Sequence, residues 1–389
     1  MRIAVDAHRI AHFPRSSHCR YLLGMLPHWQ NDPRISEVIL ALPRSAEKLA
    51  FPQELDGLSK IRKEFGESAR NPTMGLGNLF YFHQVDIPAI LKRTKPDVFL
   101  STFHLCPFFT GGVPVVTTIH DLCPLDYQID SLGWLKWRET HRFQLWTACL
   151  KSRLLIAVSK FTASALKTYC PRKADSIRMV HNGFDCPESK PSPLPHENYL
   201  LWVGELGYRK NPELALDTLA ALLPQNPQLR LRCVIPARDR TEAEAMMKQR
   251  NLCGHIDWES NIPEQRLDEL YRQACALIVP SRCEGFGYPI LEGISRGIPS
   301  LGYRRTPAIE ITGNTLDLPS ELSPSAFAAS IQKVLNLTQD ERASLSRSLI
   351  ERAGTFTTHR MATQTADVLL EACQTKSQAL SHPSITPHT

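Results

Sequence analysis

Short apolar runs alternate with stretches of helical spacing along most of the chain. The runs that we expect to form buried parallel strands are residues 3–5, 37–42, 97–101, 114–120 and 154–159 and, after a gap, 198–204, 229–235 and 275–281. Helical spacing is clearest between the later runs, at residues 211–223, 241–252 and 264–274. Two successive series of this kind predict an α/β fold with two Rossmann-like, doubly wound domains and a cleft between them.

The break between the two series is easy to locate. Residues 186–197, CPESKPSPLPHE, contain four prolines and few apolar side chains, so they cannot continue a helix or a central strand. We expect a linker here, between a domain of residues 1–185 and a domain of residues 198–374. The polar residues 375–389 are predicted to form a flexible tail, and the helix before them could pack back on the first domain.

Composition narrows the class of protein. The chain has 389 residues, of which 42% are hydrophobic and 22% charged, and its mean hydropathy is −0.23. These values exclude a disordered or membrane-embedded chain, and no apolar window reaches the ~18 residues of a transmembrane helix. The first ten residues include Asp6 and Arg9, where a secretion signal needs an unbroken apolar stretch. We therefore expect a cytoplasmic protein.

Charge and cysteine content add two expectations about partners. Residues 1–190 carry 25 Lys and Arg against 17 Asp and Glu, a net of +8, whereas the remainder has a net of −2. The basic half suggests an anionic partner such as membrane headgroups or a phosphorylated acceptor, although a scattered surface excess is an equal alternative. Nucleic acid is not expected, because no Lys/Arg run is interleaved with aromatic residues. Eleven cysteines without any Cys-x-x-Cys spacing favour reduced, mostly buried thiols and no thiolate zinc site.

The sharpest chemical pattern is LIVPSRCEGFGYPILEGISRG, residues 277–297. It predicts a strand, a glycine-containing loop and a helix that starts near Tyr288-Pro289, whose free N–H groups would favour phosphate. Glu284 in the loop and Glu292 one turn inside the helix are separated by seven residues. Carboxylates suit a sugar or ribose because they accept hydrogen bonds from neighbouring hydroxyls. By spacing alone, two solvated glutamates are the commoner case.

A second strand-to-helix turn carries cations. In YLLWVGELGYRKNPELAL, residues 199–216, Arg209 and Lys210 precede a helix that is predicted to start near Asn211-Pro212. Two cations at the ligand edge of a parallel sheet suit a diphosphate, although an exposed basic turn is the commoner alternative.

The stretch 131–153 combines three Trp with several Lys and Arg. A basic, aromatic helix could rest on anionic lipid. The alternative, which we favour on sequence, is a domain helix that buries its Trp face and exposes its basic face.

Taken together, these motifs resemble a known family. The segments EGFGYPILE, VGELGYRKN, LIAVSKFTASAL, RMVHNGFD, VVTTIHDLCPLDY and LDELYRQA are similar to those of the retaining family-4 glycosyltransferases with the GT-B fold. The resemblance extends from Met1 to about residue 370. The TIHDL variant resembles the mannosyltransferase-like branch that assembles bacterial cell-surface polysaccharides.

The resemblance implies a role for each matching residue. Glu292 would hold the ribose hydroxyls of the nucleotide, and Glu284 would contact the transferred sugar. Lys210, with Arg209 nearby, would stabilise the diphosphate leaving group. The backbone N–H groups that approach sugar and diphosphate would be those of Gly285, Phe286, Gly287 and Tyr288.

Two further positions follow from the same resemblance. His120 ends a strand of the first domain and would face the donor sugar; on sequence alone, a lone histidine there is more often a capping or core residue. Ser159, which comes directly after the apolar run LLIAV, is interpreted as structural.

The implied activity is the retaining transfer of a hexose from a nucleotide-diphosphate sugar to a glycan or polyprenyl-linked acceptor. Mannose is the first candidate sugar and GDP-mannose the first candidate donor. The first domain would bind the acceptor and the second the donor. No Asp-x-Asp occurs in the chain, so we expect no metal at the diphosphate and activity in excess EDTA. The alternatives are a nucleotide-sugar epimerase of the same fold and a non-catalytic, nucleotide-sugar-binding partner subunit.

Two departures from the family pattern motivate the non-catalytic alternative. Many relatives have an arginine directly after the glycine that ends the strand, whereas here Gly204 is followed by Glu205. Relatives also have a glycine-rich loop near the acceptor, whereas residues 14–21, PRSSHCRY, contain no glycine. A Cβ at a position of close backbone approach would obstruct a ligand.

Overall fold

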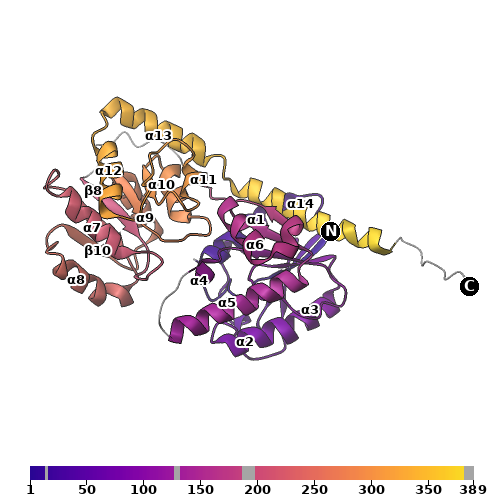
Figure 1. The fold of residues 1–389 in the computed structure, drawn as a ribbon. Helices are drawn as coiled ribbons and strands as arrows, with labels where there is room; N and C mark the ends of the chain where they lie inside the picture. Colours follow the sequence, from indigo (N-terminus) through magenta and orange to yellow (C-terminus); the bar gives the residue numbers. More distant parts are fainter. Residues whose placement is uncertain (14–15, 127–131, 186–197, 381–389) are drawn as a thin grey trace, which may run out of the picture. The chain divides into compact units, whose positions relative to one another are not determined.

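A computed structural model describes residues 1–13, 16–126, 132–185 and 198–380 (Figure 1). The chain divides into two compact units, of which unit 1 comprises Met1–Gly183 with Thr358–Thr389 and unit 2 comprises Phe184–Thr357. Each unit is built on one parallel sheet. The predicted linker, residues 186–197, lies outside the described residues.

Unit 1 contains a seven-stranded parallel sheet in the order β3-β2-β1-β4-β5-β6-β7. Its strands are β1 (Arg2–Asp6), β2 (Glu37–Leu42), β3 (Ile61–Phe65), β4 (Val98–Ser101), β5 (Val115–Ile119), β6 (Leu154–Ala157) and β7 (Ile177–Met179). The helical elements are α1 (Ser17–Asn31), η1 (Arg44–Ala46), η2 (Gln53–Leu55), α2 (Leu76–Tyr81), η3 (Phe82–Asp86), α3 (Ile87–Thr94), α4 (Cys123–Asp126), α5 (Leu132–Lys151), α6 (Lys160–Tyr169), η4 (Pro171–Ser176) and α14 (Thr358–Leu380).

The central strands of this sheet were predicted correctly. Helices cover both faces of the sheet, so the side chains of a central strand must be apolar or paired, and the strand appears in the sequence as an apolar run. β4, β5 and β6 are buried at every residue. The edge strands β3 and β7 were not predicted. β3 reads Ile-Arg-Lys-Glu-Phe with exposed positions, and β7 has only three residues, so neither has the apolar run that marks a central strand.

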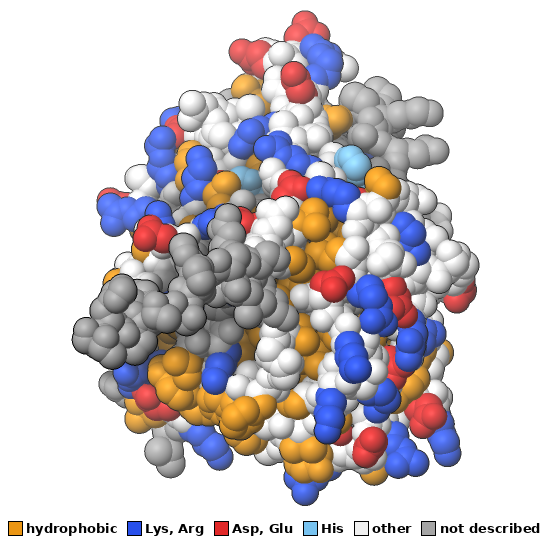
Figure 2. Space-filling model, turned by 90° about the vertical axis from the view of Figure 1, so that its right-hand side faces the viewer, with side chains coloured by type: hydrophobic (Ala, Val, Ile, Leu, Met, Phe, Trp, Pro, Cys, Tyr) orange, Lys and Arg blue, Asp and Glu red, His pale blue; other side chains and the backbone are white. Residues whose placement is uncertain are grey.

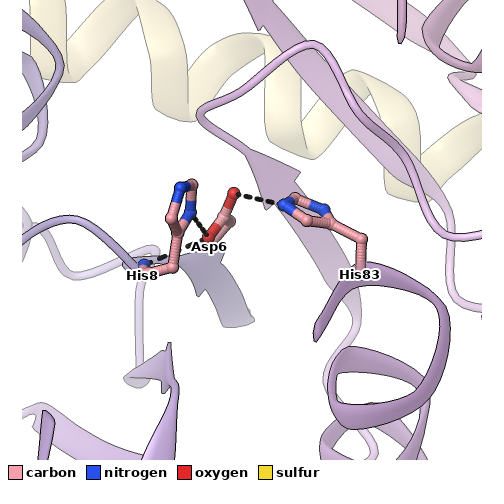
Figure 3. Close-up of side chains that lie close together, drawn as sticks. All are labelled: Asp6, His8 and His83. Atoms are coloured by element: carbon pink, nitrogen blue, oxygen red, sulfur yellow. Dashed lines mark hydrogen bonds and ion pairs between the residues drawn. The ribbon is translucent and has the colours of Figure 1, made fainter. Parts of the chain in front are cut away.

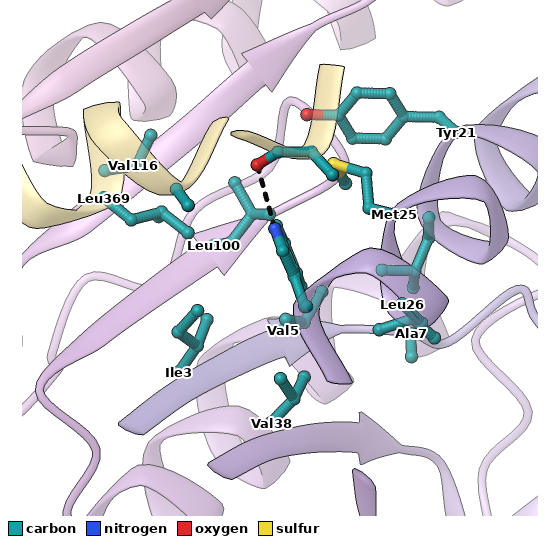
Figure 4. Close-up of a cluster of buried hydrophobic side chains, with 14 of the residues drawn as sticks. Ile3, Val5, Ala7, Tyr21, Met25, Leu26, Val38, Leu100, Val116 and Leu369 are labelled. Carbon is teal, nitrogen blue, oxygen red and sulfur yellow. Dashed lines mark hydrogen bonds between the residues drawn. The ribbon is translucent and has the colours of Figure 1, made fainter. Parts of the chain in front are cut away.

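Helix α14 joins unit 1 although it is the last element of the chain. It packs against α1 and against β4, β5 and β6. Leu369 of α14 lies in the same core cluster as Met25 and Val116, and the Trp29 indole N–H donates to the carbonyl oxygen of Ala362 at 3.0 Å (Figure 4). A buried indole needs such a partner. The core of the first unit is therefore completed by a segment from the far end of the sequence.

Unit 2 contains a five-stranded parallel sheet in the order β10-β9-β8-β11-β12. Its strands are β8 (Tyr199–Val203), β9 (Arg230–Val234), β10 (Ile256–Glu259), β11 (Ala276–Val279) and β12 (Ser300–Gly302). Its helical elements are α7 (Pro212–Leu222), η5 (Ala237–Asp239), α8 (Arg240–Gln249), α9 (Glu264–Gln273), α10 (Tyr288–Ser295), α11 (Ala308–Thr312), α12 (Pro324–Leu335) and α13 (Gln339–Ala353). The predicted strands and helices of this region are confirmed, whereas β10 and β12, both at sheet edges, were missed.

Two sequence-based expectations need correction. Helix α14 continues to Leu380, so residues 375–380 are helical and not part of a tail; residues 381–389 lie outside the described residues. The expectation of reduced thiols is wrong for Cys149 and Cys170. These two cysteines form a disulfide, because α5 and the end of α6 bring their Cα atoms to within 6.6 Å of each other. Among the described residues, no helix has an apolar stretch of the length that crosses a membrane.

Candidate functional site

Two loops of unit 2 meet at the carboxyl end of the sheet. β8 and β11 are neighbours and parallel, so the loop from β8 to α7 and the loop from β11 to α10 emerge at the same edge. The Arg282 backbone N–H donates to the Arg209 carbonyl oxygen at 2.9 Å, and the Asn211 side-chain amide donates to the Pro280 carbonyl oxygen at 3.2 Å. Asn211 occupies the N-cap position of α7 as predicted, but its side chain joins the two loops and does not cap the helix.

Glu284 lies between the two predicted cations. Its carboxylate oxygens are 2.7 Å from Lys210 Nζ and 3.1 Å from an Arg209 guanidinium nitrogen. Burial disfavours the charged carboxylate, but the positive charges of Lys210 and Arg209 outweigh it and lower the pKa of Glu284 to about 2. Glu284 is therefore a fully ionised carboxylate at neutral pH. The three groups together carry a net positive charge, which suits an anionic ligand.

Glu292 is held by a residue that the sequence analysis did not single out. Glu292 is buried in α10, and its Oε2 atom accepts a hydrogen bond of 2.8 Å from the Tyr271 hydroxyl group. Tyr271 belongs to α9 and is completely buried. The only signal in the sequence was its place in the LDELYRQA segment. Tyr271 therefore holds the Glu292 carboxylate in place, one turn inside the helix that follows the Glu284 loop.

The loop between the two glutamates has the backbone form that the motif predicted. Gly287 precedes α10 with a φ of 103°, a conformation that L side chains rarely adopt. A Cβ at this position would also meet the Ile311 side chain at 3.4 Å. Pro289 lies in the first turn of α10, where its missing N–H costs no helical hydrogen bond, and the N–H groups of Ile290 and Leu291 donate to the Gly287 carbonyl oxygen. Phe286 and Tyr288 are buried and pack edge to face.

Glu205, the first departure from the family pattern, forms an ion pair, so its negative charge is partly compensated. Its carboxylate is 3.2 Å from the Arg238 guanidinium group, and both side chains are exposed. An exposed pair of this kind has a small net effect on its surroundings. The second departure, the 14–21 loop, is described in part: Ser16 caps α1, and residues 14–15 lie outside the described residues.

His120 of unit 1 lies at the carboxyl end of β5 and is nearly buried. Its ring packs against those of His18 and Tyr21, with centroids 4.4 Å and 5.0 Å away. Its backbone N–H donates to His104 Nε2 at 3.2 Å, and its own Nε2 atom has no partner among the described residues. Burial and the neighbouring His18 lower the pKa of His120 well below its usual value. His120 is thus a neutral imidazole with one free polar atom, and its neighbours His18 and His104 were not predicted.

The predicted burial of the Trp face of residues 131–153 is wrong. In helix α5, Trp137 is 41% exposed and Trp146 is 53% exposed, while the buried face consists of residues such as Leu145 and Ala148. The helix therefore displays aromatic and basic side chains on the surface together. Figure 2 shows that hydrophobic side chains are exposed among Lys and Arg on one face of the protein.

Neither Glu284 nor Glu292 belongs to a group of side chains that could hold a metal ion among the described residues. The described group that could do so, Asp6, His8 and His83, lies in unit 1. The chemistry available at the edge of unit 2 is thus a buried ion-paired carboxylate, two cations, a tyrosine-held carboxylate and a helix N-terminus. This arrangement can bind a ligand that combines hydroxyl groups with phosphate.

Family models match most of the chain. The Glycosyl transferases group 1 model matches residues 187–353, and the Glycosyltransferase Family 4 model matches residues 36–188. The O-antigen chain mannosyltransferase B of Escherichia coli is 26% identical over 268 residues, which cover 64% of this chain and 68% of that protein. A D-inositol 3-phosphate glycosyltransferase of Corynebacterium efficiens is 26% identical over 185 residues, 46% of this chain and 43% of its own length.

Solved structures agree on the fold. Anabaena HepE in complex with UDP and glucose superposes with a TM-score of 0.71 at 17% identity, covering 95% of this chain and all of that one. WaaG, a glycosyltransferase involved in lipopolysaccharide biosynthesis, has a TM-score of 0.71 at 16% identity, covering 94% of this chain and 99% of that one. The two glycosyltransferase models in tandem over residues 36–353 identify the chain as a glycosyltransferase of the family-4 type, and the fold that it shares with these solved structures is the GT-B fold.

Proposed function

We propose that the protein transfers a hexose from a nucleotide-diphosphate sugar to a glycan or lipid-linked oligosaccharide, with retention of configuration. The observation that carries the proposal is the arrangement at the carboxyl edge of unit 2. There, Glu284 is held between Lys210 and Arg209, and Tyr271 holds Glu292 at the start of the next helix.

Each part of the donor binds a different group at this edge. Glu292 accepts hydrogen bonds from the two ribose hydroxyls, because the two oxygens of a carboxylate together offer about four acceptor sites. Lys210 and Arg209 bind the diphosphate together with the backbone N–H groups at Gly285, Phe286, Gly287 and Tyr288. To do so the cations share their contact with Glu284, which they contact in the ligand-free protein.

Glu284 acts on the transferred sugar as a fixed negative charge. Its low pKa keeps it ionised, so it can stabilise the positive charge that develops on the sugar ring and cannot serve as a proton donor. No covalent nucleophile is assigned. The departing diphosphate accepts the proton of the acceptor hydroxyl group, and Lys210 and Arg209 stabilise the charge that remains. No metal is required at the diphosphate, so Mg²⁺ or Mn²⁺ will not stimulate transfer.

The sugar and acceptor are proposed from the relatives. Similarity to an O-antigen mannosyltransferase supports mannose, GDP-mannose and cell-surface polysaccharide synthesis. Similarity in fold to a protein with bound UDP and glucose keeps UDP-sugars as the second candidates. Unit 1 would bind the acceptor, and His120 would contact the transferred sugar through its free Nε2 atom.

Product analysis tests the proposal against its alternatives. The full chain is incubated with GDP-mannose or UDP-glucose and a polyprenyl-linked glycan, and the products are identified by mass spectrometry and anomeric NMR. A glycan longer by one hexose, with the donor's anomeric configuration, supports transfer. An altered free nucleotide sugar would instead establish an epimerase, and nucleotide binding without any product would favour the non-catalytic subunit.

We also propose that the protein contacts anionic membrane through α5. The support is the exposure of Trp137 and Trp146 beside Lys136, Arg138 and Arg142. Flotation with phosphatidylglycerol vesicles should recover the wild type but not the double variant Trp137→Ser, Trp146→Ser. Leu49→Ser, at another exposed apolar position of unit 1, is the control and should float normally. Equal recovery on neutral phosphatidylcholine vesicles, or no recovery on either, contradicts the proposal.

A further inference from the structure

Three buried side chains of unit 1 converge in a place that the proposed function does not use. Asp6 ends β1, His8 follows it by two residues, and His83 comes from η3. In Figure 3 the two imidazole rings flank the Asp6 carboxylate from opposite sides. His8 Nδ1 is 2.7 Å from Asp6 Oδ1, and His83 Nε2 is 3.6 Å from Asp6 Oδ2. One ligand atom from each residue lies within 4.8 Å of the others.

The cluster is sealed from water but not satisfied internally. Asp6 and His83 are completely buried and His8 nearly so. Among the described residues, Asp6 Oδ2 and both ring nitrogens of His83 have no hydrogen-bond partner. Buried polar atoms are normally paired, so unpaired atoms on facing side chains need an explanation such as an ion.

The charge of Asp6 also indicates a bound cation. Its ion-pair partners among the described residues are the two imidazoles, with no Lys or Arg contact. A buried carboxylate requires a paired positive charge or a metal ion. A divalent cation between the three groups would supply that charge.

A neighbouring cavity and the backbone geometry are consistent with a bound ion. The cavity, of about 10 Å³, has room for about one water-sized sphere and is lined by Asp6 and His8 but not by His83. His83 lies in a π-helical segment, Phe82–Asp86, and such segments are frequent at functional sites because the wider turn redirects a side chain.

We propose that Asp6, His8 and His83 bind one divalent transition-metal ion of the zinc class. Two imidazole nitrogens and a carboxylate oxygen are a donor set that suits such ions, with a fourth position left for water. Tetrahedral zinc with bonds of about 2.0–2.1 Å separates its ligand atoms by about 3.4 Å, so small side-chain rotations suffice. His8 binds through Nδ1 in the tautomer that carries its proton on Nε2.

This site is independent of the proposed donor chemistry. All three ligands belong to unit 1, whereas Glu284, Lys210 and Glu292 belong to unit 2. The metal is proposed as a bound ion of the first unit and not as a partner of the diphosphate. Its test therefore measures binding and stability and not sugar transfer.

The test uses the full chain, stripped with EDTA and dialysed, and titrated with Zn²⁺ and with Co²⁺ as a spectroscopic probe. We expect one equivalent of either ion to bind, a rise in melting temperature, and visible cobalt bands typical of nitrogen and oxygen ligands. His83→Gln should weaken binding by about 100-fold or more. His255→Gln, a half-buried histidine of unit 2, is the matched control and should bind like the wild type.

Three results would overturn the proposal. These are the absence of stoichiometric binding by the wild type, binding that His83→Gln leaves unchanged, and a cobalt spectrum with a sulfur charge-transfer band, which would place the ion on a cysteine such as the exposed Cys253. If His83→Gln fails to fold by circular dichroism, His8→Asn replaces it. The cobalt spectrum of the wild type distinguishes imidazole from thiolate ligands in either case.

Discussion

The carboxyl edges of the two sheets are built from opposite kinds of polar group. In unit 2 the groups are charged and paired, as Glu284 is with Lys210 and Glu292 is with the Tyr271 hydroxyl group. In unit 1 they are mostly buried imidazoles around one buried carboxylate, Asp6, and His120 and His83 each keep ring nitrogens without partners among the described residues. The same parallel architecture thus presents ion pairs at one sheet edge and, at the other, imidazoles beside one buried carboxylate.

The difference has a physical cause. A charged donor such as a nucleotide diphosphate requires fixed cations, and partly buried cations such as Lys210 are stabilised by a counter-charge when the ligand is absent. Glu284 supplies that counter-charge, and in the proposed mechanism it then contacts the sugar. The acceptor group proposed to react is an uncharged hydroxyl, so a histidine such as His120 needs no counter-charge in unit 1.

The largest effect is expected for Glu284→Gln. The amide keeps the shape but removes the charge, so kcat for transfer should fall by about 10²–10³-fold. Affinity for the nucleotide diphosphate should stay equal or increase, because Lys210 and Arg209 lose a competing anion. Steady-state kinetics and isothermal titration calorimetry measure the two quantities separately.

Glu205→Gln is the matched control, since Glu205 is exposed and paired with Arg238. It should leave both quantities nearly unchanged. A loss of nucleotide binding in Glu284→Gln would contradict the division of roles between the carboxylate and the cations.

A smaller loss is expected for His120→Gln in unit 1. Removing the free imidazole nitrogen should lower kcat by about 10-fold, equivalent to ~1.4 kcal/mol, while the nucleotide dissociation constant is unchanged. Steady-state kinetics measures kcat of this variant, and isothermal titration calorimetry measures its nucleotide dissociation constant. Weaker nucleotide binding in this variant would mean that unit 1 contributes to the nucleotide site, against the comparison drawn above.

Acid should weaken unit 1 before unit 2. Burial lowers the pKa of His83 to about 4 and, with neighbouring histidines, that of His104 to about 3, from 6.5. Above pH 6.5 both histidines are neutral in the folded and unfolded states, so they do not lower the free energy of unfolding. Below pH 6.5 the unfolded state takes up protons that the folded state does not, and the free energy of unfolding falls until the pH reaches about 4 for His83 and about 3 for His104. For Glu284, burial raises the pKa but Lys210 and Arg209 lower it further, from 4.5 to about 2, so its contribution is lost only between those values.

Pulsed hydrogen exchange after incubation in EDTA at each pH measures the order of events. Peptides from β5 should lose protection at a pH higher by on the order of one unit than peptides from β11. Loss of protection in β11 first would contradict the assignment of neutral imidazoles to unit 1.

The smallest effect is expected for Tyr271→Phe. One hydrogen bond to Glu292 contributes about 1 kcal/mol, so nucleotide affinity should fall roughly 5-fold while kcat is nearly unchanged. Fluorescence titration of the nucleotide measures it. An unchanged affinity would mean that Tyr271 has only a packing role.

The sequence predicts the elements that have a local signal, such as an apolar run or a charged turn. Central strands have continuous apolar runs, and the loops at 204–211 and 280–288 carry glycine, proline and charge at recognisable spacings. Edge strands such as β3 and β12 are short or polar, so no local signal marks them. The Cys149–Cys170 disulfide, the Tyr271–Glu292 hydrogen bond and the Asp6–His8–His83 cluster depend on residues that only tertiary packing brings together.

The most direct test of the donor site is thermal unfolding with GDP, UDP and ADP, without added metal, for the wild type and Glu292→Ala. A ligand at about 100 times its dissociation constant stabilises by ~2.7 kcal/mol, which gives a clear rise in melting temperature. We predict that one nucleotide stabilises the wild type and not the variant, which would also identify the donor class. No stabilisation by any of the three, or equal stabilisation of Glu292→Ala, would contradict a nucleotide-sugar site at this edge of unit 2.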